Sequence, residues 1–208
     1  MTPHEIVEDD WHRCFIALSP DAATRDALAA MPVVSAAARR VGIDQLHMTV
    51  AFLGSVPPEK GARLAAQLSS VVAPLPAQRA EHAQYWPSAT HPRLVVVPFE
   101  AGDGLGDLET RVRALVAALQ LPIDDHRPFR PHITLARFAR TARPVREATD
   151  RRGRSPAVSS PASMPASPPG AAVLQVIPRF DTLTLYSSTL ARHGARYRAL
   201  ASVAVPPV

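Results

Sequence analysis

Two short stretches of the chain carry the same pattern of side chains that could do chemistry. Residues 47–51 and 132–136 both run histidine, apolar, threonine, apolar, alanine, and their histidines lie 85 residues apart. Because side chains alternate along a strand, His47 and Thr49 should share one face, and the second copy should behave likewise. Each copy then presents an imidazole and a hydroxyl on an otherwise apolar strand. The repeat also indicates an internal duplication.

Two imidazoles on either side of a cleft suit in-line displacement at phosphorus. A neutral histidine can take a proton from an attacking water, while a protonated one gives a proton to the departing oxygen. The hydroxyls of Thr49 and Thr134 can hydrogen-bond the non-bridging phosphoryl oxygens as charge develops there. We therefore expect His47 and His132 to be a catalytic pair that needs no metal. The two motifs are chemically symmetric, so spacing alone does not say which histidine is the acid.

Three further side chains are candidates for contact with a substrate. Arg130 lies two residues before His132, so on a continuous strand its side chain would be on the same face. It could then bind the phosphate or form a surface ion pair. Phe52 could stack on a base, but its parity with Val50 favours a place in the core. Tyr186 is undecided between the same two roles.

Residues 124–126, an Asp-Asp-His run, raise the alternative of a metal site near the second motif. Zinc requires three or four ligands of fixed geometry, and His126 lies outside the motif in a predicted turn. We therefore predict neither a metal nor any other cofactor.

Hydrophobic periodicity predicts an α+β fold, because strands outnumber helices and alternate with them irregularly. A helical stretch is expected from residue 21 to about 40, with Ser19 and Pro20 at its start and Pro32 interrupting or ending the first helix. Two more are expected at residues 58–72 and along the apolar stripe of 105–119. Strands are expected at residues 13–18, 46–53, 80–86, 93–99, 132–138, 173–177, 180–187 and 197–205.

Length and composition limit the organisation of the chain. With 208 residues, 47% of them hydrophobic, residues 13–208 should form one domain after a polar tail at 1–12. The segment 151–172 holds five prolines, five serines and five alanines, so we expect a disordered insertion. The arginine-rich run 137–154 before it is either a basic arm for nucleic acid or a solvated segment.

Targeting and charge features agree with a soluble protein. There is no apolar run long enough to span a membrane, no apolar leader, and one cysteine, so we expect a monomer in the cytoplasm. The formal charge is +5, and Lys60 is the only lysine among 23 basic residues. This arginine excess permits an anionic partner, although a coding bias explains it equally well.

The motifs and their flanks resemble the 2H phosphoesterases, in particular the RNA 2',3'-cyclic phosphodiesterases, also described as 2'-5' RNA ligases. The resemblance rests on residues 13–18, 46–54, 127–137, 185–190 and 194–197. It implies a bilobal α+β fold with pseudo-twofold symmetry, antiparallel-sheet lobes, helices outside and a central cleft. Two departures are visible: no tryptophan precedes the first motif at 41–45, and the insertion at 151–172 is unusual.

The resemblance also implies an activity, the hydrolysis of a terminal 2',3'-cyclic phosphate on RNA or a nucleotide to a 2'-phosphate. By likeness, His47 would be the proton donor and His132 the proton acceptor. Two alternatives stay open: a 2'-5' phosphodiesterase, ligase or small cyclic-nucleotide phosphodiesterase, and a non-catalytic RNA- or nucleotide-binding module. The intact histidines and threonines count against the binding module.

Overall fold

The structure is a computed structural model that describes residues 11–33, 38–102, 104–123, 128–138, 173–191 and 194–208. Several sequence predictions concern segments outside these ranges. They are most of the polar tail, the Asp-Asp-His run at 124–126, the insertion at 151–172 and the arginine-rich run beyond residue 138.

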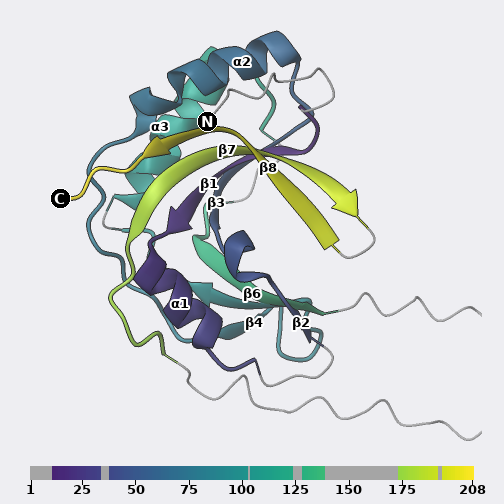
Figure 1. Cartoon of the computed structure of the whole chain (residues 1–208), viewed down its shortest axis with the longest axis vertical. Helices are drawn as coiled ribbons and strands as arrows, with labels where there is room; N and C mark the ends of the chain where they lie inside the picture. The colour runs from purple at the N-terminus through teal and green to yellow at the C-terminus, as the bar shows by residue number, and fades with distance from the viewer. Residues whose placement is uncertain (1–10, 34–37, 103, 124–127, 139–172, 192–193) are drawn as a thin grey trace, which may run out of the picture.

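One antiparallel sheet of eight strands organises the described part of the chain, in the order β4-β5-β6-β3-β1-β7-β8, with β2 also paired to β6. This mixed architecture confirms the predicted α+β class (Figure 1). The strands are β1 (Cys14–Pro20), β2 (Ala38–Arg40), β3 (Met48–Gly54), β4 (Gln84–Trp86), β5 (Leu94–Pro98), β6 (His132–Phe138), β7 (Phe180–Ala191) and β8 (Gly194–Ala204).

The helices lie on the outside of the curved sheet. They are α1 (Ala22–Ala30), α2 (Pro58–Gln67) and α3 (Leu105–Ala118), with the short 3-10 turns η2 (Ile43–Gln45) and η3 (Leu68–Val71). Figure 1 shows α2 and α3 together at one end and α1 apart from them. No helix among the described residues is long and apolar enough to cross a membrane.

The two motif strands occupy the middle of the sheet. Each belongs to a strand–helix–strand unit, β1-α1-β3 or β5-α3-β6, in which the motif strand pairs antiparallel with the first strand. β3 and β6 then pair with each other through Met48 and Ile133, the second residues of the two motifs. Equivalent positions of the repeat therefore meet at the centre of the sheet.

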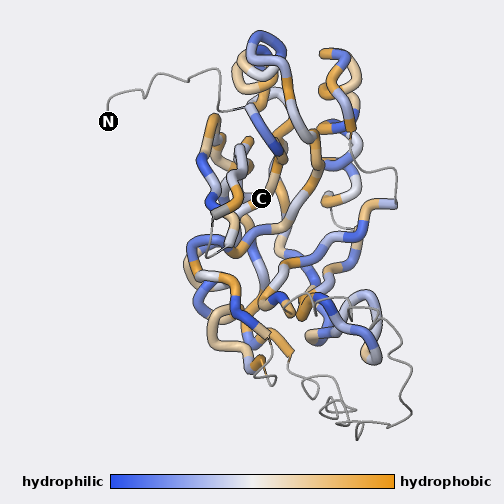
Figure 2. Tube along the Cα trace, turned by 90° about the vertical axis from the view of Figure 1, so that its right-hand side faces the viewer, coloured by the Kyte–Doolittle hydropathy of each residue, from blue (hydrophilic) through white to orange (hydrophobic). Residues whose placement is uncertain are grey.

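The core lies between the sheet and its helices, and hydrophobic and hydrophilic residues alternate along much of the chain (Figure 2). The stripe of α3 buries Leu105, Leu108 and Val112, as its periodicity predicts. Trp11, inside the segment predicted as a polar tail, is only 3% exposed. Its ring lies against Gly61 of α2 so closely that a Cβ there would come within 2.3 Å of it. The folded body therefore includes Trp11.

The predicted start of the first helix is wrong. Ser19 and Pro20 continue β1, because they pair with β7, and the cap is Asp21, whose Oδ1 accepts from the Thr24 amide at 2.8 Å. Long-range pairing has outweighed a local capping signal.

The first helix ends next to Pro32, one of the two predicted outcomes, whereas the helical stretch predicted up to residue 40 and one predicted strand are wrong. The helix stops at Ala30, before Pro32, and residues 38–40 form β2. The Arg40 guanidinium donates to the carbonyls of Met31 and Ala29, which lie at the end of α1. Residues 173–177 form no strand.

Candidate active site

The pairing of β3 with β6 brings the two histidine motifs side by side. Met48 and Ile133 face each other across the pair and are fully buried. In an antiparallel pair, continuing that register places His47 opposite Thr134 and Thr49 opposite His132. All four polar side chains are partly exposed, so they lie on the face away from the core, as predicted from their parity.

Both imidazoles are anchored by the same backbone contact. The Nδ1 atom of His47 lies 2.7 Å from the carbonyl oxygen of Gln45, and that of His132 lies 2.7 Å from the carbonyl oxygen of Arg130. A carbonyl oxygen only accepts, so each Nδ1 carries a hydrogen and donates it. The Nε2 atom of each neutral ring is then the atom that can accept a proton, and in the charged ring it can give one.

Both histidines favour the neutral form in the free protein. The pKa of His47 is lowered from 6.5 to about 4, mainly by burial, with smaller contributions from the charges of Arg137 and His132, while the Gln45 hydrogen bond acts in the opposite direction. Burial also lowers the pKa of His132, assisted by the charges of Arg130 and Arg137. A bound anion would offset these effects, because it stabilises an imidazolium beside it.

A β-bulge occurs at the same position in both motifs. Ile16 pairs with Ala51 but Ala17 pairs with Thr49, which leaves Val50 as an extra residue in β3. Val95 pairs with Ala136 and Val96 with Thr134, and Leu135 is the extra residue in β6. Two consecutive side chains are therefore buried in each strand, and the alternation reverses after them.

This reversal overturns the expectation for Phe52, which is 47% exposed rather than buried in the core. Its ring lies 6.1 Å from that of Phe15, which in turn lies 5.2 Å from His47. Arg137 holds the same position in the second motif, five residues after its histidine, and is also exposed. Its charge acts on both imidazoles. The sequence places Arg137 in the basic run 137–154. In a strand without a bulge, residue 137 would point to the opposite face from His132, so its position near the site is not visible from the sequence.

Aromatic rings surround His47. Phe15 and the edge-on ring of Tyr197 both lie 5.2 Å from the imidazole, and Tyr186 stacks on Phe15 at 5.2 Å. Tyr186 was undecided between the core and the substrate side. It lines a pocket of about 350 Å³ beside His47 and remains only partly buried. The other lining residues are Asp44, Gln45, Leu46, Arg196 and Tyr197.

The surroundings of His132 differ from those of His47. The ring of Trp86 lies 4.6 Å from the imidazole, and the Arg130 guanidinium carbon lies 4.2 Å above the Trp86 ring. Arg130 thus makes a cation–π contact with Trp86 near the histidine. Its predicted contact with a phosphate stays a prediction. The described residues include no group of three or more side chains suited to a metal ion.

Comparison with known proteins gives a consistent result. The sequence profile described as the 2'-5' RNA ligase superfamily matches residues 22–160. No curated protein matches. Among solved structures, Escherichia coli LigT complexed with NADP+ is 27% identical, covering 94% of this chain and 98% of LigT at a TM-score of 0.64. LigT complexed with 3'-AMP is 27% identical, covering 93% of this chain and 98% of LigT at a TM-score of 0.62. TT0787 of Thermus thermophilus is 26% identical, covering 94% of this chain and 98% of that one at a TM-score of 0.63.

Proposed function

The chain belongs to the 2'-5' RNA ligase superfamily, and from that premise we propose that it hydrolyses a terminal 2',3'-cyclic phosphate to a 2'-phosphomonoester. The substrate class is RNA ends or nucleotides that carry this group. The ligands NADP+ and 3'-AMP, with which LigT was crystallised, support a nucleotide-like ligand.

The reaction adds one water across the P–O3' bond. His132, neutral, takes a proton from the attacking water at its Nε2, and the new P–O bond forms as the P–O3' bond breaks. His47, protonated at Nε2 by virtue of the bound anion, gives its proton to O3'. The products are a 2'-phosphomonoester and a free 3'-hydroxyl, and each imidazole then returns to its starting form by exchange with water.

The supporting observation is the symmetric anchoring of the two imidazoles. Nδ1 of His47 and of His132 donates to the carbonyl two residues before it, so both rings keep Nε2 for proton transfer. Thr49 and Thr134 lie opposite these rings, where their hydroxyls can donate to phosphoryl oxygens. Arg137 supplies a positive charge to the same site, which favours a phosphoryl anion there.

The test uses an oligoribonucleotide that ends in a 2',3'-cyclic phosphate, with EDTA present throughout. A 2'-phosphate end should accumulate, and His47→Ala or His132→Ala should each reduce kcat by about 10²–10⁴, the usual contribution of a general acid or base. His91→Ala is a matched control, because His91 is an exposed loop histidine that belongs to neither motif. Full activity in either motif variant would refute the two-histidine mechanism.

The same assay separates the sibling activities. A substrate with an internal 2'-5' linkage and a small cyclic nucleotide are offered in parallel at equal concentration. Preferential turnover of either one would replace the proposed reaction with that alternative. Tight binding of all three without any product would instead indicate a non-catalytic nucleotide-binding module.

A further inference from the structure

The pocket beside His47 is built from segments that lie far apart in the sequence. Asp44 and Gln45 come from η2, Tyr186 from β7, and Arg196 and Tyr197 from β8. The Gln45 amide donates to the Ala195 carbonyl at 2.9 Å, which ties η2 to β8 across the pocket. The walls are therefore held together before any ligand arrives.

Size and lining suit a flat aromatic ligand. About 350 Å³ lies in the range of small-molecule sites, roughly 300–1,000 Å³. The rings of Tyr186 and Tyr197 are 6.1 Å apart and partly exposed, so they can offer stacking surface to a base. Since His47 lies in the same pocket, a ligand whose phosphate meets the imidazoles can extend its base between these walls.

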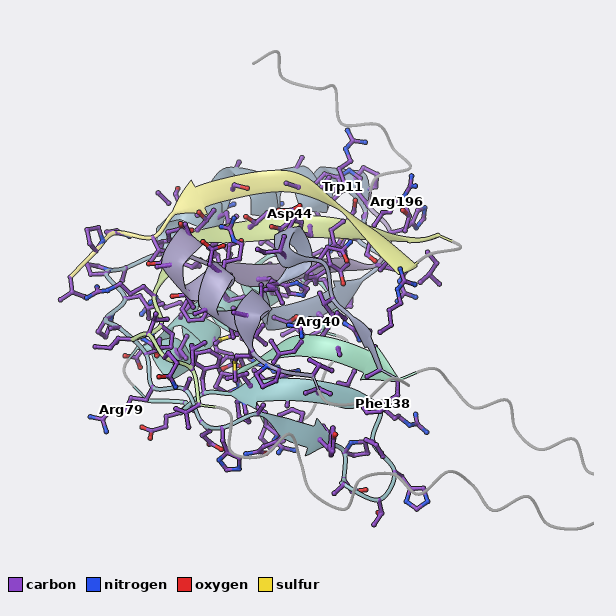
Figure 3. All side chains as sticks on the ribbon, turned by 60° about the horizontal axis from the view of Figure 1, so that its bottom comes forward. Trp11, Arg40, Asp44, Arg79, Phe138 and Arg196 are labelled. Carbon is purple, nitrogen blue, oxygen red and sulfur yellow. The ribbon has the colours of Figure 1, made fainter. Side chains whose placement is uncertain are left out.

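Two side chains of opposite charge line this pocket, so its wall is not purely apolar. Asp44 and Arg196, both labelled in Figure 3, are exposed. Among the described residues no ion pair links them. A carboxylate accepts from ring N–H and amino groups, whereas arginine donates in a fork to O6 and N7 of guanine. Guanine has both: donors at N1–H and its amino group, and acceptors at O6 and N7. Adenine has an acceptor nitrogen where guanine has N1–H, which a carboxylate does not favour.

Resting on the proposed function, we infer that this pocket holds the base of the nucleotide that carries the cyclic phosphate, and that Asp44 and Arg196 make it prefer guanine. The base then lies on the His47 side of the phosphate.

The test compares two oligoribonucleotides that differ only in a terminal guanosine or adenosine 2',3'-cyclic phosphate. The guanosine end should have a kcat/KM at least about fivefold higher, the lower limit of what a bidentate base contact gives. Asp44→Asn and Arg196→Gln should each reduce this ratio, by slowing the guanosine substrate more than the adenosine one. Asp26→Asn, an exposed carboxylate on α1, is the control and should keep the ratio. Equal rates for the two ends in the unaltered protein would overturn the inference.

A binding measurement keeps this inference separate from the proposed reaction. Calorimetry with guanosine and adenosine 2'-monophosphates requires no turnover, and the guanosine compound should bind at least about fivefold more tightly. If neither oligonucleotide is hydrolysed yet the guanosine compound binds preferentially, the reaction is wrong and the base site stands. If hydrolysis proceeds with no base preference in either assay, the reaction stands and the base site is wrong.

Discussion

The two histidines share a local geometry but differ in their neighbours. Each follows the same sequence pattern, donates from Nδ1 to the carbonyl two residues earlier, and precedes a bulge at the fourth motif position. His47 lies among Phe15, Tyr186 and Tyr197 beside a pocket, whereas His132 lies beside Trp86. The short repeat specifies how each imidazole is held, and the strands beyond it specify what surrounds the imidazole.

This difference suits the two histidines to different roles, although their local backbone geometry is the same. The aromatic pocket at His47 is the proposed site for the base, while the cations near His132 disfavour a positive charge on that ring. A neutral His132 is suited to accept a proton from water. A substrate anion must bind before His47 can carry a proton at neutral pH, because burial lowers its pKa to about 4.

After the two histidine variants, the largest effect should come from Arg137, whose charge acts on both imidazoles. Arg137→Gln removes a charge that can bind a phosphoryl oxygen, and a charge-assisted hydrogen bond is worth roughly 1.5–3 kcal/mol, or about 10- to 150-fold in kcat/KM. Steady-state kinetics on the cyclic-phosphate oligonucleotide measures the loss. Arg63→Gln on α2 is the matched control. A loss no larger than in that control would show that Arg137 does not serve the site.

The next prediction concerns the free energy of unfolding in acid, which should depend on His47 because its pKa is lowered in the folded protein. As the pH falls through 6.5, the unfolded chain binds a proton that folded His47 does not bind until about pH 4. The free energy of unfolding should therefore decrease between pH 6.5 and 4, by at most about 3 kcal/mol from this group. Urea unfolding at several pH values should show a flatter dependence for His47→Gln. The same slope in both proteins would contradict the buried, neutral state of His47.

A smaller effect should distinguish the two imidazoles directly. The Arg130 charge lowers the pKa of His132 and is not among the causes of the shift at His47. Arg130→Gln should raise the pKa of His132 and leave that of His47 unchanged, as followed by NMR titration of the ring protons. The acidic limb of the pH–rate profile should move upward with it. An equal change in the pKa of both histidines would contradict the described difference in their surroundings.

The smallest effect concerns the position after each bulge, which is Phe52 on one side and Arg137 on the other. Because Phe52 is 47% exposed, Phe52→Ala should cost no more than about 1 kcal/mol of folding free energy. Its neighbour Leu53 is fully buried, and Leu53→Ala should cost about 2–5 kcal/mol. Thermal and urea unfolding of both variants measures the difference. A similar cost at the two positions would contradict the reversed alternation after Val50.

Sequence reasoning predicted the motif strands, the α3 stripe and the α+β class, because each depends on local periodicity. It identified His47, Thr49, His132 and Thr134 as one candidate site from their types and spacing. It misplaced Phe52 and the helix start at Ser19, since a bulge and the pairing with β7 depend on partner strands remote in the chain.

The sequence by itself determined which side chains are candidates for proton transfer and that each histidine shares a strand face with its threonine, because side chains two residues apart on a strand point the same way. Only the tertiary structure decided that the two copies pair through Met48 and Ile133. It also decided that the charge of Arg137 acts on both imidazoles, and that Phe15, Tyr186 and Tyr197 lie around His47 whereas Trp86 lies beside His132. The physical reason is that register, bulges and burial are set by the whole sheet and not by any one of its strands.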